Sequence, residues 1–335
     1  MPRLKLSKPK AILIFTLVVI LALVAVYHLF IKNIASYALR SPPSAGRLET
    51  LQMMHDGIER SYHIFKPNNM RAGAPLVVNF HGSLSTGKWM RDISGYDFDY
   101  LAVKHGFPVV YPDGYDRHWN DCRASASYRA NIENIDDVGF FKALVSQIQR
   151  DENINPQEVI ITGFSNGGHM VYRLALEAPE TFLLAAPIAA NLPVNSNMGC
   201  EKSGLPVNML IFNGTNDPIN PFDSGLVAVL GNKSRGEVIS SAQTVSYWAG
   251  LANADNSRVT LMPEKDGNPK TYVMRDIRIG TKTVGLYALH GSGHVVPSQN
   301  MYFRSFLGGN AADINAAAQI YQFYRQIVAA RKTAR

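Results

Sequence analysis

The sequence predicts an α/β fold, in which a mostly parallel central sheet carries helices on both faces, preceded by one N-terminal transmembrane helix. Two patterns lead to this prediction. Short apolar runs alternate with amphipathic stretches from residue 48 onward, and a long uncharged apolar run occupies residues 11–30. Hydrophobic residues make up 46% of the 335 residues and charged residues only 18%. This composition supports a sizeable core and argues against disorder.

The N-terminal run has the features of a membrane anchor. Residues 11–30 contain no Asp, Glu, Lys or Arg, and about 20 apolar residues suffice for a helix to span a bilayer. The first ten residues hold four basic side chains and no acid, which favours a cytoplasmic N-terminus. We therefore expect a cytoplasmic basic segment at 1–10 and a transmembrane signal-anchor at 11–31, with the rest of the chain on the non-cytoplasmic side.

A cleaved signal peptide is the alternative interpretation of the same run. Ser36 and Ala38 would form a weak small-residue cleavage site, and the mature protein would then be secreted. The apolar run is longer than the usual core of a signal peptide, which favours the uncleaved anchor.

The net charge of +7 argues against a nucleic-acid partner. The positive charge gathers at the two ends of the chain, in the first ten residues and in the basic tail after Phe323. The body between them is close to neutral, whereas a nucleic-acid-binding domain needs a basic patch on its folded surface.

A short linker is expected at 32–47, because Pro42, Pro43 and Gly46 interrupt regular structure. One catalytic domain is then expected at 48–335. Residues 60–65 alternate like an antiparallel strand, and the other predicted strands are continuous apolar runs typical of buried strands. The strands are expected at 60–65, 75–80, 107–111, 158–162, 183–190, 207–213 and 283–290, and the helices at 133–150, 167–178 and 314–330.

The segment "GFSNG", from Gly163 to Gly167, fits the pattern G-x-S-x-G of a nucleophile elbow. Small residues two positions before and after the serine permit the tight turn that lifts its hydroxyl out of the sheet. A glycine-rich turn without catalytic role would fit the same letters. The strand before Ser165 and the amphipathic helix after it favour the elbow.

A serine nucleophile requires a histidine base and an orienting carboxylate, which in this arrangement follow in the order Ser, Asp, His. His290 ends the last predicted strand and His294 lies in the glycine-rich loop after it, so we prefer His294. Asp217 follows the strand at 207–213 and is the preferred acid, with Asp223 as the alternative. The backbone N–H groups of Ser83 and Asn166 are the candidate oxyanion donors, and His81 fits a buried turn residue.

Together these residues resemble the polyhydroxybutyrate depolymerase/feruloyl esterase-like branch of the α/β-hydrolases. The resemblance covers about residues 56–324 and rests on "DGIERSYHIFKP", "PLVVNFHGS", "YPDGYDRHWND", "DDVGFFKALV", "GFSNGGHMVYRLA", "NGTNDP" and "GSGHVVP". It implies hydrolysis of carboxylic esters by Ser165, Asp217 and His294, without metal or organic cofactor. It also implies that Trp119, Asn120 and Asp121 contact substrate at the edge of the site.

The sequence departs from this family at two points. Val295 and Val296 stand where an aromatic residue often follows the catalytic histidine, and no Ser/Thr-rich linker leads to a polymer-binding domain. Both departures favour short or oligomeric esters, of the hydroxyalkanoate or hydroxycinnamate type, over polymer granules. A peptidase or amidase with the same triad, and an inactive envelope binding module on the same fold, are the alternatives.

Cys122 and Cys200 are the only cysteines of the chain. Both fall in predicted loops of a domain expected outside the cytoplasm, where disulfides persist. We expect them to form a bond that stabilises the domain and pins the loop with Trp119. Two unrelated packing cysteines are the alternative.

Overall fold

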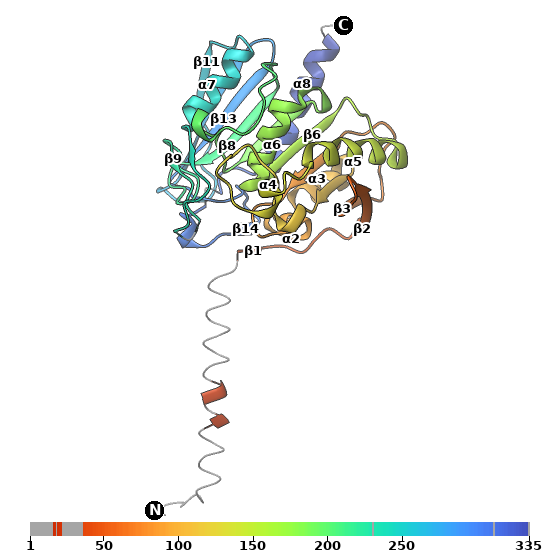
Figure 1. Cartoon of the computed structure of the whole chain (residues 1–335), viewed down its shortest axis with the longest axis horizontal. Coiled ribbons are helices and arrows are strands. Elements are labelled where there is room, and N and C mark those ends of the chain that lie inside the picture. Colours follow the sequence, from red (N-terminus) through yellow and green to blue (C-terminus); the bar gives the residue numbers. More distant parts are fainter. Residues whose placement is uncertain (1–15, 18, 22–35, 230, 311, 334–335) are drawn as a thin grey trace, which may run out of the picture. The chain divides into compact units, whose positions relative to one another are not determined.

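The computed structural model describes residues 16–17, 19–21, 36–229, 231–310 and 312–333 (Figure 1). The chain divides into two units, Met1–Ser36 and Tyr37–Arg335. The segment predicted at 1–10 and most of that predicted at 11–31 lie outside the described residues. Within the described residues, no helix combines the length and the apolar character that a membrane crossing requires.

The second unit is built on a mixed sheet whose middle strands are parallel. Its strand order is β11-β12-β13-β8-β7-β6-β4-β5-β3-β2. Strands β5, β4, β6, β7, β8 and β13 pair in parallel, and antiparallel strands flank them at both edges. The strands are β2 (Gly46–His55), β3 (Ile58–Pro67), β4 (Leu76–Phe80), β5 (Val109–Pro112), β6 (Val159–Phe164), β7 (Leu184–Ile188), β8 (Met209–Gly214), β11 (Ser257–Leu261), β12 (Tyr272–Ile279) and β13 (Thr283–His290).

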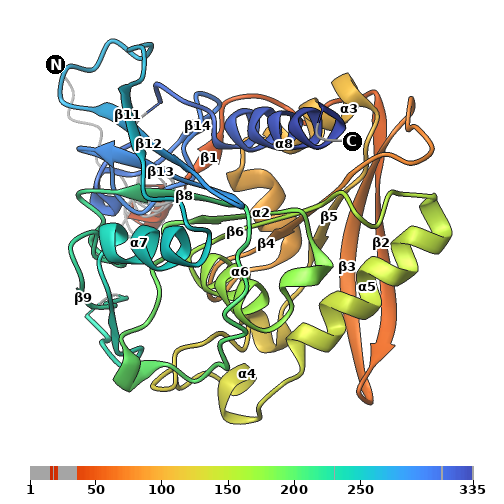
Figure 2. The ribbon, with the colours of Figure 1, turned by 90° about the horizontal axis from the view of Figure 1, so that it is seen from above.

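Helices cover both faces of this sheet (Figure 2). Helices α5, α6 and α7 pack on one face, and α2, α3 and α8 pack on the other. The helices are α2 (Gly87–Ile93), α3 (Asp97–His105), α4 (Arg129–Ile132), α5 (Asp137–Glu152), α6 (Asn166–Glu177), α7 (Ser241–Leu251) and α8 (Ala316–Thr333). The mostly parallel sheet with helices on both faces, which the sequence predicted, is confirmed.

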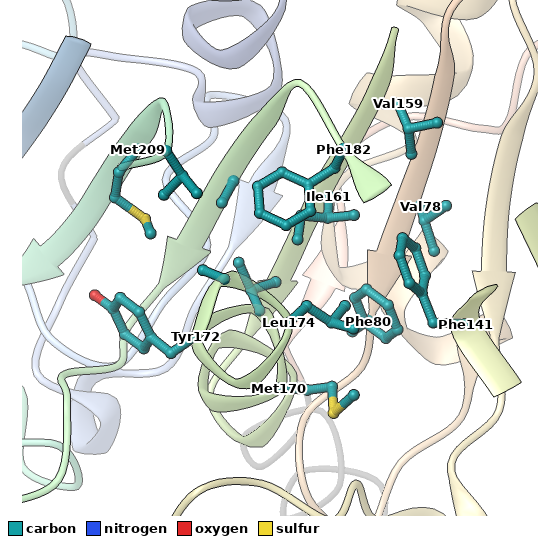
Figure 3. Close-up of a cluster of buried hydrophobic side chains, with 14 of the residues drawn as sticks. Val78, Phe80, Phe141, Val159, Ile161, Met170, Tyr172, Leu174, Phe182 and Met209 are labelled. Atoms are coloured by element: carbon teal, nitrogen blue, oxygen red, sulfur yellow. The ribbon is translucent and has the colours of Figure 1, made fainter. Parts of the chain in front are cut away.

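Burial on both faces explains the continuous apolar strands. In β4, Val78 and Phe80 join the core under α5 and α6, whereas Val77 joins the opposite core. Figure 3 shows Val78 and Phe80 packed with Phe141 and Met170 between the sheet and these helices. Because every residue of such a strand is buried, its sequence cannot alternate with polar residues.

The predicted elements match observed ones, with shifts at their ends. The helix expected from 133 begins at residue 137, because Asp136 caps it by accepting the N–H of Gly139 at 2.8 Å. The strand expected at 183–190 ends at Ile188, since Ala189 turns with φ +53°. Strand β2 and helices α2 and α3 had no sequence prediction.

The expected linker at 32–47 is wrong for the residues from 37 onward that join the domain. Strand β1 (Tyr37–Ala38) pairs with β14 (Met301–Tyr302), and the N–H of Leu39 donates to the carbonyl of Asn300 at 2.7 Å. Arg40 forms an ion pair with the buried Asp97, and Gly46 already belongs to β2. The prolines indicated the breaks in this segment. No local pattern in the sequence indicated that it pairs with β14, which lies far away along the chain.

The structure confirms the disulfide between Cys122 and Cys200. The bond joins the loop after β5 to the loop between β7 and β8, where Gly199 also donates its N–H to the carbonyl of Cys122 at 2.7 Å. Cys122 itself is only 1% exposed. The bond therefore fastens a buried segment, the one that follows Trp119.

Replacing both cysteines by serine should lower the free energy of unfolding by about 2–5 kcal/mol, because the open chain regains loop entropy. Urea denaturation of the oxidised protein and of the double variant measures this difference. Reductant should shift the midpoint of the wild-type protein and leave that of the variant in place. A wild-type midpoint that is insensitive to reductant, with two alkylatable thiols, would contradict the bond.

Candidate active site

Ser165 stands at the turn between β6 and α6 in a strained backbone conformation, with φ +58° and ψ −118°. A non-glycine residue at such angles persists only where its surroundings enforce it. Here the Ser165 N–H donates to the carbonyl of Ile188 in the adjacent strand at 2.9 Å, and the Ser165 carbonyl accepts the N–H of His169 at 2.9 Å. Ser165 is half-buried between buried neighbours, so its side chain lies at the surface of the sheet edge.

The two glycines of the motif are required by close contacts rather than by unusual φ angles. A Cβ on Gly167 would lie 2.3 Å from the carbonyl oxygen of Phe80 and 2.6 Å from that of His81. A Cβ on Gly163 would lie 2.5 Å from the carbonyl oxygen of Gly167. The elbow therefore presses directly against the end of β4, as the G-x-S-x-G pattern predicted.

Asp217 and His294 meet at the same edge of the sheet. They follow β8 and β13, which are adjacent and parallel, so that Gly214 stands opposite Leu289. His294 Nδ1 lies 2.7 Å from Asp217 Oδ2, and both side chains are almost fully buried. The other carboxylate oxygen, Oδ1, accepts the N–H groups of Ile219 and Asn220, each at 2.8 Å. Asp217 thus offers one carboxylate oxygen to the imidazole and the other to the backbone, an arrangement well suited to orient a histidine.

The imidazole of His294 is also fixed by its backbone and its ring. The backbone N–H of His294 donates to the carbonyl of Leu307 at 2.6 Å. Its ring packs against that of Phe164, the residue before Ser165, with 4.8 Å between centroids. This contact brings the histidine to the elbow.

The alternatives that the sequence left open lie elsewhere. Asp223 is exposed, and among the described residues its carboxylate makes no contact with a histidine. His290 ends β13 and stacks on Tyr272 of β12, with 4.2 Å between ring centroids. Of the four residues considered, only Asp217 and His294 form a pair.

The loop after β4 lies against the elbow on the other side. A Cβ on Gly82 would be 3.4 Å from the Cβ of Ser165, so the chain at Gly82 and Ser83 runs beside the serine. His81 holds this loop: its Nδ1 lies 2.6 Å from the carbonyl oxygen of Gly82, and its Nε2 accepts the N–H of Gly114 at 2.8 Å. Burial lowers the pKa of His81 to about 4, so the ring is neutral at pH 7 and can accept this bond. The buried turn residue predicted at His81 is confirmed.

The side chain of Asn166, the residue after Ser165, is fully engaged in a buried network. Its Oδ1 accepts the N–H of Trp119 at 2.8 Å, and its Nδ2 donates to Asp121 Oδ2 at 2.6 Å and to the hydroxyl of Tyr128 at 3.0 Å. Arg123 Nε donates to Asp121 Oδ1 at 3.0 Å. The network uses only the side chain of Asn166, the first residue of α6, and N–H groups of a first helical turn have no partner within the helix.

The charges of this network compensate one another. Burial alone would raise the pKa of Asp121, but the guanidinium of Arg123 and the hydroxyl of Tyr128 bring it below its usual range. Asp121 therefore stays ionised inside the protein, where a charge without a partner would be very costly. Arg123 and Tyr128 carried no recognisable motif, so sequence reasoning missed both of them.

The segment Trp119, Asn120 and Asp121 was expected to contact substrate, and the structure places its side chains in the interior. All three are buried. Trp119 Nε1 donates to the carbonyl of His81 at 2.9 Å, and Asn120 Nδ2 donates to the carbonyl of Ile135 at 2.9 Å. These residues tie the loop after β4 to the elbow. Their expected contact with substrate has no support in this arrangement, because their polar groups already have partners in the protein.

The described residues contain no group of three or more His, Cys, Asp or Glu side chains placed to hold a metal ion. The arrangement at the sheet edge combines a hydroxyl on a strained turn with a histidine–carboxylate pair, and nucleophilic acyl transfer requires both.

Comparison with known proteins shows that esterases are similar to this chain, although no family model matches it. NocK of Nocardia uniformis subsp. tsuyamanensis, to which an esterase function is assigned, is 26% identical over 290 residues, which are 81% of this chain and 80% of NocK. Feruloyl esterase C of Emericella nidulans is 32% identical over 117 residues, or 35% of this chain and 38% of that protein. Poly(3-hydroxyalkanoate) depolymerase C of Paucimonas lemoignei is 32% identical over 128 residues, or 37% of this chain and 29% of the depolymerase.

The chain is similar to esterases. The prediction of a carboxylic-ester hydrolase is confirmed by these relatives, as is the resemblance to feruloyl esterases and polyhydroxyalkanoate depolymerases. Among solved structures, an acetyl xylan esterase from Aspergillus awamori matches with a TM-score of 0.50 at 18% identity, over 76% of this chain and 96% of that one. This match supports the α/β fold.

Replacing Asn166 by Ala should lower kcat for ester hydrolysis by about 10- to 100-fold, because a misaligned oxyanion donor loses part of its contribution. The variant keeps the backbone N–H and loses only the side-chain hydrogen bonds of Asn166. Steady-state kinetics and thermal melting together measure the effect.

Thr162→Val is the matched control. It removes a buried hydrogen bond of β6, the strand before Ser165, from Thr162 Oγ1 to the carbonyl of Ala186 at 2.8 Å, and it leaves the side-chain hydrogen bonds of Asn166 intact. We expect similar loss of stability from both variants and loss of kcat only from Asn166→Ala. Equal kcat values in the two variants would refute the positioning role.

Proposed function

We propose that this chain is a membrane-anchored serine esterase that works through Ser165, His294 and Asp217 and an acyl-enzyme intermediate. The observation that carries the proposal is the 2.7 Å pairing of His294 with Asp217. It occurs beside a serine held at φ +58° on a strand-to-helix turn, the arrangement that activates a hydroxyl.

In this mechanism Ser165 Oγ attacks the ester carbonyl carbon while His294 Nε2 takes its proton. Asp217 keeps the proton of Nδ1 in place and stabilises the imidazolium. The backbone N–H groups of Ser83 and Asn166 receive the negative charge that develops on the carbonyl oxygen. The imidazolium then protonates the departing alcohol. A water molecule, deprotonated by the same histidine, then attacks the acyl carbon. The bond to Ser165 Oγ breaks, the imidazolium returns its proton to Oγ, and the acid is released.

The substrates we propose are short or oligomeric esters of the hydroxyalkanoate or hydroxycinnamate type. Support comes from the relatives, which include a feruloyl esterase and a poly(3-hydroxyalkanoate) depolymerase. Val295 and Val296, which follow His294, are both buried. The two residues directly after this histidine therefore provide no exposed aromatic side chain that could contact a polymer surface.

Ser165→Ala should lower kcat by a factor on the order of 10⁶, and His294→Ala should be similarly damaging, because the triad acts as a unit. His290→Ala is the control: His290 lies outside the pair, so this variant should keep its kcat and lose only the stacking on Tyr272. Turnover of p-nitrophenyl esters and of matched anilides by the wild-type protein and all three variants tests the roles.

Two outcomes would contradict the assignment. Near-normal turnover by folded Ser165→Ala would show that Ser165 is not the nucleophile. An inactive His290→Ala variant together with an active His294→Ala variant would show that His290 is the base. Faster cleavage of the anilides than of the esters would identify an amidase instead.

The membrane anchor is the second part of the proposal. It is supported by the uncharged run at 11–30 and the basic residues before it. Contacts of the chain just after this run add to the support: Tyr37 and Ala38 pair with β14, and Arg40 forms an ion pair with Asp97. A cut after Ala38 would divide the region that pairs with β14, so the uncleaved form suits the fold better than the secreted one.

The full-length protein should sediment with membranes, resist extraction by high salt, and dissolve in detergent. Val19→Arg together with Leu23→Arg should move it to the soluble fraction, because each charge costs about 2.5–3.5 kcal/mol at the centre of a membrane helix. Mature protein whose N-terminus lies near Leu39 would instead establish cleavage and secretion.

A further inference from the structure

Arg235 carries a buried guanidinium group, two nitrogen atoms of which make no hydrogen bond to the residues that the structure describes. The side chain is 9% exposed, and its Nε and Nη1 have no hydrogen-bond partner among the described residues. Buried charged donors are rarely left unpaired, because their desolvation is then uncompensated. A ligand that supplies acceptors would remove this cost.

The nearest charges leave Arg235 without a counter-ion. Asp121 is committed to Arg123, Tyr128 and Asn166. Burial and the like charge of Arg123 together lower the pKa of Arg235. Two guanidinium groups thus share the region with one carboxylate, and the surplus is positive. An anion is the ligand that this surplus favours.

The position of Arg235 relates it to the proposed catalytic residues. Its loop follows β8 and Asp217, and the loop of Tyr128 follows β5, so both lie at the carboxyl edge of the sheet with the elbow. Ser127 and Ser234, the residues before Tyr128 and Arg235, approach each other with 3.3 Å between hydroxyl oxygens. Tyr128 in turn touches the side chain of Asn166, the residue after Ser165.

The surroundings of Arg235 are fixed. Asn197 Nδ2 donates to the carbonyls of Arg235 and Glu237, at 3.0 and 3.1 Å, while Asn197 Oδ1 accepts the N–H of Ser125 at 2.9 Å. Asn197 belongs to the loop that the disulfide joins to Cys122. The backbone of Arg235 is therefore held in place before any ligand arrives, which reduces the entropy lost on binding.

A flat ring pair stands in the same neighbourhood. His118 stacks on Tyr128 with 4.5 Å between centroids and 12° between planes. Burial lowers the pKa of His118, and the charge of Arg235 adds to this effect, so the ring stays neutral. The ring pair offers apolar contact beside a cation, which suits a ligand with a short carbon chain and an anionic end.

We propose that Arg235 binds a free carboxylate of the substrate, so that the preferred substrates are esters carrying a carboxylate beyond the scissile bond. A short oligomer of a hydroxy acid with a free acid end has this form. The guanidinium can hold both carboxylate oxygens through parallel N–H donors. This inference rests on the proposed esterase function and names the substrate class that the same site would select.

The test compares two forms of a 3-hydroxybutyrate dimer, one ending in a carboxylate and the other in a carboxamide of the same size. Wild-type kcat/KM for the central ester should be about 10- to 100-fold higher for the carboxylate form, the range expected for hydrogen bonds to a charged group. Arg235→Gln should reduce this ratio to near one and leave turnover of the carboxamide form and of p-nitrophenyl butyrate within about threefold.

Arg129→Gln is the matched control, because it removes an exposed cation of the same region that already pairs with Glu133. The control should keep the preference for the carboxylate. Melting temperatures separate a structural role from binding: loss of an unpaired buried charge should leave the melting temperature of Arg235→Gln unchanged or higher.

Binding without turnover gives a second readout. The carboxylate dimer should bind Ser165→Ala about tenfold or more tightly than it binds the double variant Ser165→Ala, Arg235→Gln, by calorimetry. Equal affinities, or a wild-type kcat/KM ratio near one, would overturn the carboxylate site. A wild-type protein that cleaves no ester would overturn the proposed esterase function instead, whatever the calorimetry shows.

Discussion

The contact between the elbow and the end of β4 is the constraint on which the candidate site depends. Gly167 approaches the carbonyl oxygens of Phe80 and His81 so closely that a Cβ has no room between them. This contact fixes the start of α6 against the loop after β4, so that Gly82 lies beside Ser165. Strand adjacency in the sheet then brings Asp217 and His294 to the same edge.

A buried polar network stabilises this contact, and a disulfide bond fastens the segment that carries the network. Asp121 holds the side chain of Asn166, and the next residue, Cys122, is bonded to Cys200. Ionised groups in an interior tolerate little displacement, because their compensation depends on short hydrogen bonds. The network thus holds the side chain of Asn166 in place, and its carboxylate, that of Asp121, is already paired with Arg123.

Local sequence patterns predicted the sheet, its main helices and the residues at its carboxyl edge. The elbow, Asp217 and His294 could be found because strand-turn signals and motif spacing are local properties. Arg123 and Tyr128 could not be found, because their partners lie across loops whose path no periodicity encodes. The same limit explains why Trp119 was expected at the substrate and why Tyr37 was assigned to a linker. The segment around Arg235 offered neither a motif nor a periodic pattern.

The central claim is that Ser165 is the nucleophile activated by His294. Labelling of the full-length protein in detergent with a fluorophosphonate, followed by peptide mapping, tests this claim most directly because the probe reacts with activated serines. We expect one adduct, on Ser165, formed rapidly in the wild-type protein and in His290→Ala and very slowly in His294→Ala. An adduct on another serine, or equal labelling rates with and without His294, would contradict it.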